Sequence, residues 1–241
     1  MLVTLKHGSQ SLEMGKHVNV LIPEKKAPIG GFPVLYLLHG YYGDYTDWLY
    51  LSNIIRYVEG LDLVVVMPDG ANSYYANHPH GLKYHDYISK DLVKRIEETF
   101  HVSNDRKNRY IAGLSMGGFG ALSVGLSNPE LFSKVIALSA VVDIKKRKAS
   151  FNEGSRVYQF ETLFGNLEDS RLDIYALSKN INDQDLLVVC GTEDFLYDDN
   201  KAFHEYLLKE NIKHTYVEES GNHNWDFWDK HIQTTLNFTT M

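Results

Sequence analysis

Short runs of apolar and β-branched residues alternate with stretches of helical spacing along nearly the whole 241-residue chain. The runs typical of β-strands occupy eight ranges, 2–6, 17–23, 34–38, 61–67, 109–112, 134–138, 186–190 and 214–218. Helical spacing occurs between them, over 47–59, 84–100, 117–127, 200–210 and 225–236. This alternation predicts an α/β fold with a mostly parallel eight-stranded sheet and helices on both faces. The first two runs have no helix between them, so we expect an antiparallel hairpin at one edge of the sheet.

The length and continuity of the chain favour a single domain over residues 1–241. A chain of this length buries roughly 70–75% of the surface that its unfolded form exposes, and no repeat or Pro/Gly-rich linker divides it. The segment 143–185 interrupts the alternation and is too long for a simple connection, so we expect it to form a small helical cap. Its basic run, Lys145 to Lys148, is typical of a solvated face, and attraction of an anionic substrate is the alternative.

The charge balance argues against polyanionic partners. Lys and Arg number 24 against 31 Asp and Glu, which gives a formal net charge of −7. This sign opposes binding to nucleic acids and to anionic membrane surfaces. The N-terminus lacks a charged start followed by a long apolar stretch, and no apolar run is long enough to span a bilayer. A cytoplasmic location is therefore expected.

The most specific motif is the stretch Gly113-Leu114-Ser115-Met116-Gly117-Gly118-Phe119-Gly120. It follows a strand-like run and opens a helix-like one, which is the context of a nucleophilic serine on a sharp strand-to-helix turn. The serine of such a turn adopts strained backbone angles, and the flanking glycines avoid side-chain clashes. A bare Gly-x-Ser-x-Gly arises by chance about 0.1 times in a chain of this composition, and the two further glycines make the match rarer. Ser115 is therefore the candidate nucleophile.

A serine nucleophile requires a histidine base that is oriented by a carboxylate. In this architecture the acid and then the histidine follow the serine along the chain, each just after a later strand. The last two strand-like runs are followed by Asp194 and by the glycine-containing loop of His223, respectively. Asp194 and His223 are therefore the predicted acid and base. Glu193 and Asp198 stay open as alternatives for the acid, because an offset of one residue reverses the direction of a side chain.

The tetrahedral oxyanion of acyl transfer needs N–H donors. One donor is expected from Met116, the residue after the nucleophile. The other is expected from the loop after the third strand-like run, where Tyr41 is the preferred donor and Gly40 the competitor. His39 precedes the serine in the chain and is interpreted as a structural support for this loop.

Tyrosines are concentrated around the expected oxyanion loop. Ten of the 16 tyrosines fall between Tyr36 and Tyr87. Amphipathic rings in such loops can line an acyl or sugar pocket, whereas packing in the core is the alternative for each of them. The predicted substrate-binding residues are Tyr42, Tyr74, Tyr75 and Trp225.

These motifs together resemble the esterase D group of α/β-hydrolases, which includes S-formylglutathione hydrolases, tributyrin esterases, acetyl and feruloyl esterases and mycolyltransferases. The resemblance covers nearly the whole chain and implies an α/β-hydrolase fold with Ser115, Asp194 and His223 as the catalytic triad. The chain is most similar to the small tributyrin esterase-like members, which act on short acyl esters. The resemblance rests on Val20 to Pro23, Leu37 to Gly40, Trp48, Val66 to Asp69, Gly113 to Gly120, Gly191 to Asp194, Gly221 to Trp225, and Trp228.

The sequence thus predicts a serine carboxylesterase that hydrolyses short-chain acyl esters through an acyl-enzyme. Acetylated or feruloylated carbohydrates are candidate substrates. Neither a metal nor an organic cofactor is expected, since this chemistry needs none, and the lone Cys190 lies in an apolar run with no second thiol to share a metal site or a disulfide. A small-molecule ester is the expected partner. The sequence leaves open whether the protein forms a homo-oligomer.

Three other functions use the same fold. Thioester hydrolysis needs the same residues, but S-formylglutathione hydrolases usually carry a Ser-Gly-Leu-Thr-Cys stretch where this chain has His39 to Gly43. A peptidase of this fold would normally carry an extra recognition domain, for which the chain leaves no room. A non-catalytic binding module is the third alternative, because folds of this kind host unrelated functions.

Overall fold

An eight-stranded sheet forms the centre of the computed structural model, which describes residues 1–151 and 154–240. Its strand order is β1-β2-β4-β3-β5-β6-β7-β8. From β4 to β8 all neighbouring strands are parallel, and β2 pairs antiparallel with β1 and with β4. The predicted α/β fold with a mostly parallel sheet is thereby confirmed. The strands are β1 (Leu2–Ser9), β2 (Met14–Leu21), β3 (Val34–Leu38), β4 (Val64–Pro68), β5 (Arg109–Leu114), β6 (Lys134–Leu138), β7 (Asp185–Gly191) and β8 (Thr215–Glu219).

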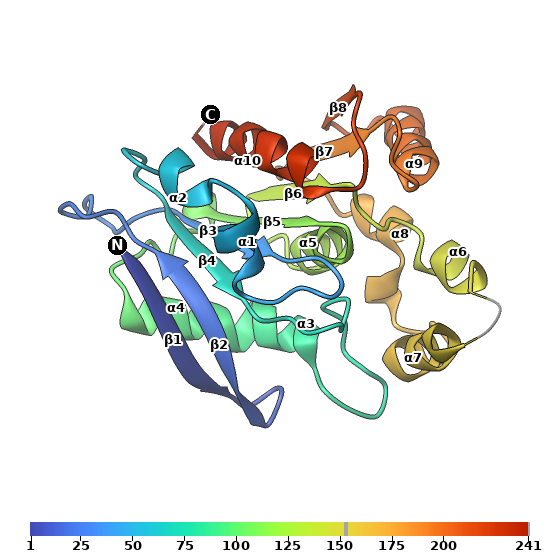
Figure 1. Ribbon diagram of the computed structural model, residues 1–241, viewed down its shortest axis with the longest axis horizontal. Coiled ribbons are helices and arrows are strands. Elements are labelled where there is room, and N and C mark those ends of the chain that lie inside the picture. Colours follow the sequence, from blue (N-terminus) through green and yellow to red (C-terminus); the bar gives the residue numbers. More distant parts are fainter. Residues whose placement is uncertain (152–153, 241) are drawn as a thin grey trace.

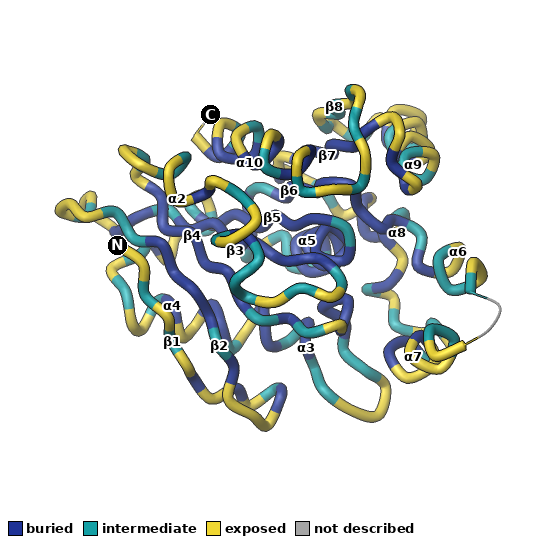
Figure 2. The backbone as a smooth tube through the Cα atoms, viewed as in Figure 1, coloured by how far each residue is buried: buried dark blue, intermediate teal, exposed yellow. Residues whose placement is uncertain are grey.

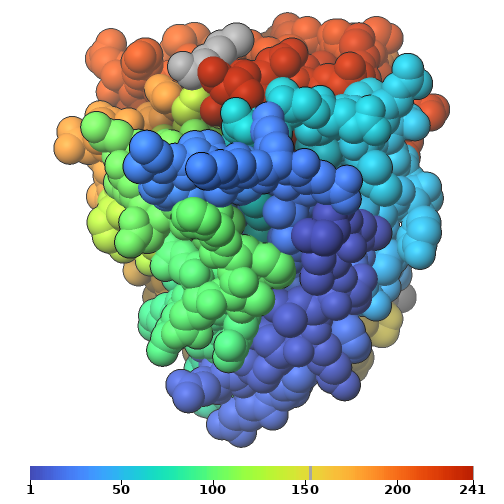
Figure 3. Space-filling model, turned by 90° about the vertical axis from the view of Figure 1, so that its left-hand side faces the viewer, coloured from blue at the N-terminus to red at the C-terminus, as the bar shows by residue number. Residues whose placement is uncertain are grey.

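The expected hairpin lies at one edge of the sheet. Strands β1 and β2 pair over their full length, from Leu2 opposite Leu21 to Ser9 opposite Met14. Figure 3 shows this end of the molecule, with the dark-blue hairpin beside the green chain near residue 100. The hairpin is joined to that part of the chain by Asp91, whose carboxylate accepts hydrogen bonds from the Ser9 hydroxyl and the Ser11 N–H at 2.5 and 2.8 Å.

Helices cover both faces of the sheet and bury it on both sides (Figures 1 and 2). Alternate residues of β3 belong to different cores: Val34, Tyr36 and Leu38 pack on the α5 side, and Leu35 and Leu37 on the α10 side. This explains why the central strands are continuous apolar runs. The helices are α1 (Asp47–Leu51), α2 (Ile54–Tyr57), α3 (Tyr84–Asp86), α4 (Val93–Thr99), α5 (Met116–Ser127), α6 (Ile144–Ala149), α7 (Ser155–Phe164), α8 (Ile174–Ser178), α9 (Tyr197–Lys209) and α10 (Trp225–Thr240), with a π-helical turn η1 (Tyr87–Leu92) and 3₁₀ turns η2 (Arg106–Asn108) and η3 (Ser170–Leu172).

Two expected helices differ from the sequence prediction. The stretch 47–59 is not one helix but the two short helices α1 and α2. The break lies at Ser52 and Asn53, where the Asp229 carboxylate of α10 accepts hydrogen bonds from the Asn53 backbone N–H at 2.6 Å and side-chain amide at 3.1 Å. The stretch 84–100 runs through α3, η1 and α4 and is π-helical in its middle turn.

The segment expected to form a cap holds α6, α7, η3 and α8, between strands β6 and β7. Helices α6 and α7 lie at the end of the molecule opposite the hairpin and expose much of their surface (Figures 1 and 2). The division into one domain with a cap insertion stays a prediction. Within the part of the chain that the structure describes, no helix has the length and apolar character needed to cross a membrane.

The connection from β5 into α5 is packed too closely for ordinary side chains. Every residue of α5 from Met116 to Leu126 is buried, so this helix lies inside the molecule rather than on it (Figure 2). A Cβ atom added at Gly117 would lie 2.5 Å from the Leu38 carbonyl oxygen and 2.6 Å from that of His39. Both obstacles are backbone atoms at the end of β3, so they cannot turn away as a side chain would.

We expect Gly117→Ala to reduce the free energy of unfolding by about 1–3 kcal/mol, because overpacking forces the backbone apart. Urea denaturation followed by circular dichroism measures this change. Gly8→Ala is the matched control, since a Cβ at Gly8 meets nothing within 4 Å. A loss at Gly117 no larger than that at Gly8 would contradict the packing argument.

Candidate active site

Ser115 lies on the sharp turn between β5 and α5, in a backbone conformation that L-residues rarely adopt. Its φ and ψ angles are 54° and −113°. Three backbone hydrogen bonds hold this conformation: the Ser115 N–H donates to the Leu138 carbonyl at 2.9 Å, and its carbonyl accepts from Phe119 at 3.1 Å and Val141 at 3.3 Å. A strained residue persists only where its surroundings hold it in this way. The turn therefore presents the hydroxyl at the carboxyl end of the sheet.

The structure brings Ser115, His223 and Asp194 together. The Ser115 Oγ lies 2.9 Å from the Nε2 atom of His223, and the Nδ1 atom of that ring lies 2.8 and 3.0 Å from the two carboxylate oxygens of Asp194. Asp194 follows β7 and its side chain is fully buried, whereas His223 lies in the loop between β8 and α10. Because a carboxylate can only accept, Nδ1 carries the proton and Nε2 faces the serine hydroxyl as an acceptor.

Neighbouring groups fix the orientation of the acid and the base. The carboxylate of Asp194 also accepts a hydrogen bond from the Leu196 N–H at 2.8 Å. The His223 ring packs between Phe195 and Trp228, with ring centroids 4.4 and 4.9 Å away. Each member of the arrangement therefore has little freedom to turn out of alignment.

The two alternative acids lie elsewhere. Glu193 is exposed, and its carboxylate accepts hydrogen bonds from the Gly221 N–H and the Ser220 hydroxyl. The N–H of Glu193 in turn donates to the Gly221 carbonyl at 3.1 Å, so this residue ties the Asp194 loop to the His223 loop. Asp198 lies in the first turn of α9. Of these three carboxylates, Asp194 is the one that hydrogen-bonds to the His223 ring.

The oxyanion donors expected from the sequence are adjacent to this site. Met116 is the first residue of α5, where helical N–H groups have no acceptor within the helix. Tyr41 and Gly40, the two candidates for the second donor, both line the same cavity as Ser115. Among the described residues, the Tyr41 N–H has no hydrogen-bond partner. In the described part of the chain, the N–H groups of Met116 and Tyr41 are thus left without an acceptor.

His39 is buried beneath the oxyanion loop and fixes its orientation. Its Nε2 accepts a hydrogen bond from the Gly70 N–H at 2.9 Å, so Nδ1 carries the proton and donates to the Gly40 carbonyl at 2.7 Å. The Gly40 carbonyl and the Tyr41 N–H belong to one trans peptide unit and point in opposite directions. The imidazole therefore sets the direction of the Tyr41 N–H. Burial lowers the pKa of His39, which keeps the ring neutral as these two contacts require.

A cavity of about 260 Å³ opens above Ser115. Of the predicted substrate-binding residues, Tyr42, Tyr74 and Trp225 line it. Larger cavities, of about 280, 450 and 670 Å³, are also present among the described residues, and neither Ser115 nor His223 lines any of these three. The residues that line the serine cavity are Gly40, Tyr41, Tyr42, Asp47, Tyr74, Leu114, Ser115, Val141, Arg147, Arg156, Phe195, His223, Trp225 and Trp228.

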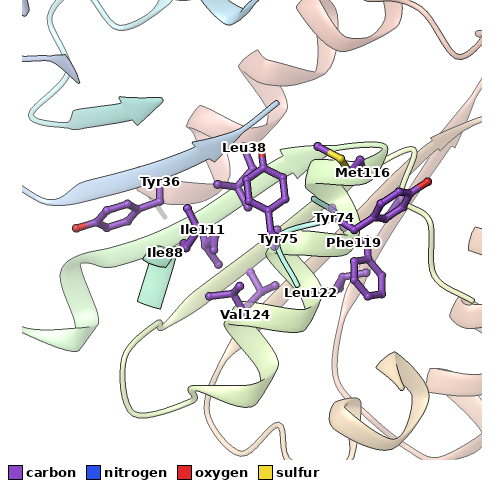
Figure 4. Packing of buried hydrophobic residues seen from close by; sticks show 14 of the residues in the cluster. Tyr36, Leu38, Tyr74, Tyr75, Ile88, Ile111, Met116, Phe119, Leu122 and Val124 are labelled. Atoms are coloured by element: carbon purple, nitrogen blue, oxygen red, sulfur yellow. The ribbon is translucent and has the colours of Figure 1, made fainter. Parts of the chain in front are cut away.

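Tyr75 is not at the cavity, and its prediction as a substrate-binding residue is not supported by its position. The side chain is fully buried and its ring packs against α5, next to Gly120 (Figure 4). Its hydroxyl donates to the His39 carbonyl at 3.1 Å. Tyr75 therefore supports the oxyanion loop from inside the core, while the adjacent Tyr74 reaches the cavity.

Several cavity residues were not predicted from the sequence. Phe195 directly follows the predicted acid, and Trp228 comes shortly after the predicted base, but neither was predicted to line the cavity. Arg147 belongs to the basic run that the sequence analysis noted, but nothing in that run distinguishes it from its lysine neighbours. Arg156 has no local signal at all, because its place at the cavity depends on how α7 packs. Among the described residues, no group of three His, Cys, Asp or Glu side chains could hold a metal ion.

Comparisons with known proteins agree with this geometry. A family model described as "Putative esterase" matches residues 9–239. An acetyl esterase from Caldicellulosiruptor saccharolyticus is 33% identical over 215 residues, which cover 82% of this chain and 79% of that protein. The substrate-bound structure of fluorophosphonate-binding serine hydrolase F from Staphylococcus aureus has a TM-score of 0.91 and 29% identity, covering 100% of this chain and 98% of that one. An S-formylglutathione hydrolase of the same organism has a TM-score of 0.88 and 29% identity, covering 100% and 99%.

Replacing His39 with leucine should reduce kcat for 4-nitrophenyl acetate by about 10- to 100-fold, because a misdirected oxyanion donor loses part of its effect. His39→Asn keeps an amide donor near the Nδ1 position, so its kcat should fall less than that of His39→Leu. Steady-state kinetics on both variants check this, with the exposed His101→Asn as the matched control. Equal losses in the leucine and asparagine variants would contradict a role in directing the Gly40 carbonyl.

The lowered pKa of His39 also predicts a pH dependence of stability. The unfolded chain binds a proton at this ring below about pH 6.5 while the folded protein resists it. More protons are then bound in the unfolded state, so the free energy of unfolding falls as the pH drops through this window. Urea denaturation at about pH 7.5 and about pH 5 measures the fall. The fall in the free energy of unfolding should be smaller in His39→Leu than in the wild type. An equal fall in the two proteins would contradict the lowered pKa of His39.

Proposed function

The chain belongs to the esterase family whose model matches residues 9–239 and is a serine carboxylesterase; we propose that it cleaves short-chain acyl esters through an acyl-enzyme formed on Ser115. One observation carries the proposal. Ser115, His223 and Asp194 form a continuous chain of hydrogen bonds, and the serine end of that chain opens into a cavity. A nucleophile, its base and the carboxylate that orients the base are the groups that acyl transfer requires.

In the first half of the reaction, the Ser115 oxygen attacks the ester carbonyl carbon. His223 Nε2, 2.9 Å from that oxygen, takes its proton, and Asp194 stabilises the imidazolium that forms. The carbonyl oxygen becomes an oxyanion that receives hydrogen bonds from the Tyr41 and Met116 N–H groups. Each such donor typically contributes about 2.7–4 kcal/mol of transition-state stabilisation. The imidazolium then protonates the leaving alcohol, the carbon–oxygen bond to it breaks, and the acyl group stays on Ser115.

In the second half, water takes the place of the alcohol. His223 removes a proton from the water molecule as its oxygen attacks the acyl carbon. The same two N–H groups stabilise the second oxyanion. When this intermediate collapses, the proton on His223 returns to Ser115, and the carboxylic acid leaves. No step in this sequence calls on a metal or an organic cofactor.

The size of the cavity supports short acyl groups. Its volume of about 260 Å³ is below the roughly 300–1,000 Å³ typical of pockets for drug-sized ligands. Its walls are largely aromatic, from Tyr42, Tyr74, Phe195 and Trp225. Because the acetyl esterase relative shares 33% of residues over most of both chains, acetyl esters are the first substrates to examine. Acetylated and feruloylated carbohydrates, in which the sugar is the alcohol and the acetyl or feruloyl group is the acyl part, remain candidate substrates.

Thioester hydrolysis is the second candidate, because one structural relative with 29% identity is an S-formylglutathione hydrolase. The same serine, histidine and oxyanion donors would serve it. Turnover of S-formylglutathione compared with that of 4-nitrophenyl acetate separates the two. The cytoplasmic location and the oligomeric state stay predictions of the sequence.

We expect Ser115→Ala to lower kcat for 4-nitrophenyl acetate and butyrate by at least about 10³-fold, because the nucleophile is removed. The folded wild-type protein should also be labelled by a fluorophosphonate probe, and the variant should not. Circular dichroism of the variant checks that the fold is kept. Retention of most of the activity in Ser115→Ala would contradict the mechanism. Absence of labelling in the folded wild-type protein would favour a non-catalytic binding module.

A further inference from the structure

Two arginine side chains extend from the 143–185 segment to the cavity above Ser115. Arg147 lies in α6 and Arg156 in α7, and both line the cavity together with Ser115 and His223. Both are half-buried. Among the described residues, Asp47 is the one carboxylate that lines this cavity, and burial raises its pKa. Positive charge is therefore concentrated on the side of the cavity formed by this segment.

The basic run of the sequence divides into residues with different roles. Lys145 and Lys146 are exposed, and Lys146 forms an ion pair with Asp199. Lys148 donates to the Gly165 carbonyl at 3.2 Å. Only Arg147 turns from this run into the serine cavity. A solvated face, the interpretation favoured by the sequence, therefore describes the first two lysines but not the arginine.

Each guanidinium is separated from a reacting group by a single aromatic ring. The Cζ atom of Arg147 lies 5.1 Å from the centroid of the Phe195 ring, which packs 4.4 Å from the His223 ring. The Cζ atom of Arg156 lies 4.0 Å from the centroid of the Tyr41 ring, whose backbone N–H is the proposed oxyanion donor. The Tyr41 hydroxyl donates to Gln159 of α7 at 2.6 Å, which joins this helix to the oxyanion loop.

The rings occupy the faces of the two guanidinium groups, and the described residues offer few hydrogen-bond acceptors to their N–H edges. Among residues 1–151 and 154–240, neither arginine forms an ion pair with a carboxylate. The Nε of Arg147 is buried and, in that same part of the chain, has no hydrogen-bond partner. Arg156 donates one hydrogen bond, to the Tyr42 hydroxyl. A guanidinium carries five N–H donors in a planar fork that matches carboxylate and phosphate oxygens.

We propose that Arg147 and Arg156 form an anion-binding subsite and that the preferred substrates are esters carrying a carboxylate or phosphate group a short distance from the scissile carbonyl. The proposal rests on the esterase function and names the substrate class of the same site. An anion at this subsite meets two half-buried cations whose faces are already packed on aromatic rings, and charge-assisted hydrogen bonds to a guanidinium are strong. The subsite thereby selects anionic esters even though the protein as a whole carries a net charge of −7.

The anion could belong to the acyl part or to the alcohol part of the ester, and two pairs of substrates separate these cases. For the acyl part, 4-nitrophenyl hydrogen adipate is compared with 4-nitrophenyl methyl adipate, which has the same leaving group without the charge. For the alcohol part, 4-carboxyphenyl butyrate is compared with 4-carbamoylphenyl butyrate. In each pair the measured quantity is the ratio of kcat/KM for the anionic ester to that for the neutral ester.

We expect this ratio to fall by about 10- to 100-fold in Arg147→Gln or Arg156→Gln for the pair whose anion reaches the subsite, as for the loss of a hydrogen bond to a charged group. Lys145→Gln is the matched control, because it removes one positive charge from the same run without touching the serine cavity. Its ratio should match that of the wild type. Unchanged ratios in both arginine variants, or an equal fall in the lysine variant, would overturn the subsite.

A binding measurement keeps this test separate from that of the esterase function. Titration calorimetry of monomethyl adipate into Ser115→Ala needs no turnover. Weaker binding when Arg147→Gln is added to that variant supports the subsite even if the wild type fails to hydrolyse the neutral esters. If the neutral esters are hydrolysed but the arginine substitution leaves anion binding and the substrate ratios unchanged, the esterase function stands and the subsite does not.

Discussion

The close contact between the Ser115 turn and the end of β3 is the constraint on which the rest of the site depends. The Gly117 position leaves no room for a Cβ against the Leu38 and His39 carbonyls, so α5 begins directly beside the loop that follows β3. This contact places the start of α5, and with it Met116, beside the loop that holds Tyr41. In the proposed mechanism the N–H groups of these two residues stabilise one oxyanion, so a wider turn would still expose a serine but would separate the two donors. The strained backbone at Ser115 is the local cost of this close turn.

The acid and the base reach the serine because parallel strands end at the same edge of the sheet. Asp194 follows β7, His223 follows β8, and the two loops are tied directly to one another. A Cβ at Gly191 would lie 2.1 Å from the Gly221 carbonyl oxygen, and Glu193 exchanges hydrogen bonds with Gly221. The loops that carry Asp194 and His223 are therefore held firmly to one another. This arrangement explains why the Glu193 carboxylate, one residue away from Asp194, bonds to the His223 loop and not to the His223 ring.

Local sequence patterns were sufficient to locate the strands and to name three residues, Ser115, Asp194 and His223, that the structure joins by hydrogen bonds. Lys134 to Leu138 could be assigned without error because apolar continuity is a property of the strand itself. The strand order and the break at Asn53 could not, since the latter depends on Asp229, 176 residues later. Tyr74 and Tyr75 show the same limit: both have positive φ angles, yet one ring reaches the cavity and the other the core. No local pattern separates two adjacent tyrosines whose surroundings come from α5 and α7.

Substrate preference depends on the part of the chain that the fold constrains least. The serine turn, His39 and the Asp194–His223 pair are held by backbone contacts and deep burial, so they can serve any ester that enters. The walls supplied by α6 and α7 come from half-exposed helices outside the sheet (Figures 1 and 2). Arg147 and Arg156 belong to these two helices. A change in this segment could therefore alter the charge of the cavity without disturbing the hydrogen bonds from Asp194 to Ser115. The net charge of −7 describes the encounter with a substrate at long range, whereas the two guanidinium groups line the cavity itself, where Coulomb interactions are screened less than between fully exposed charges.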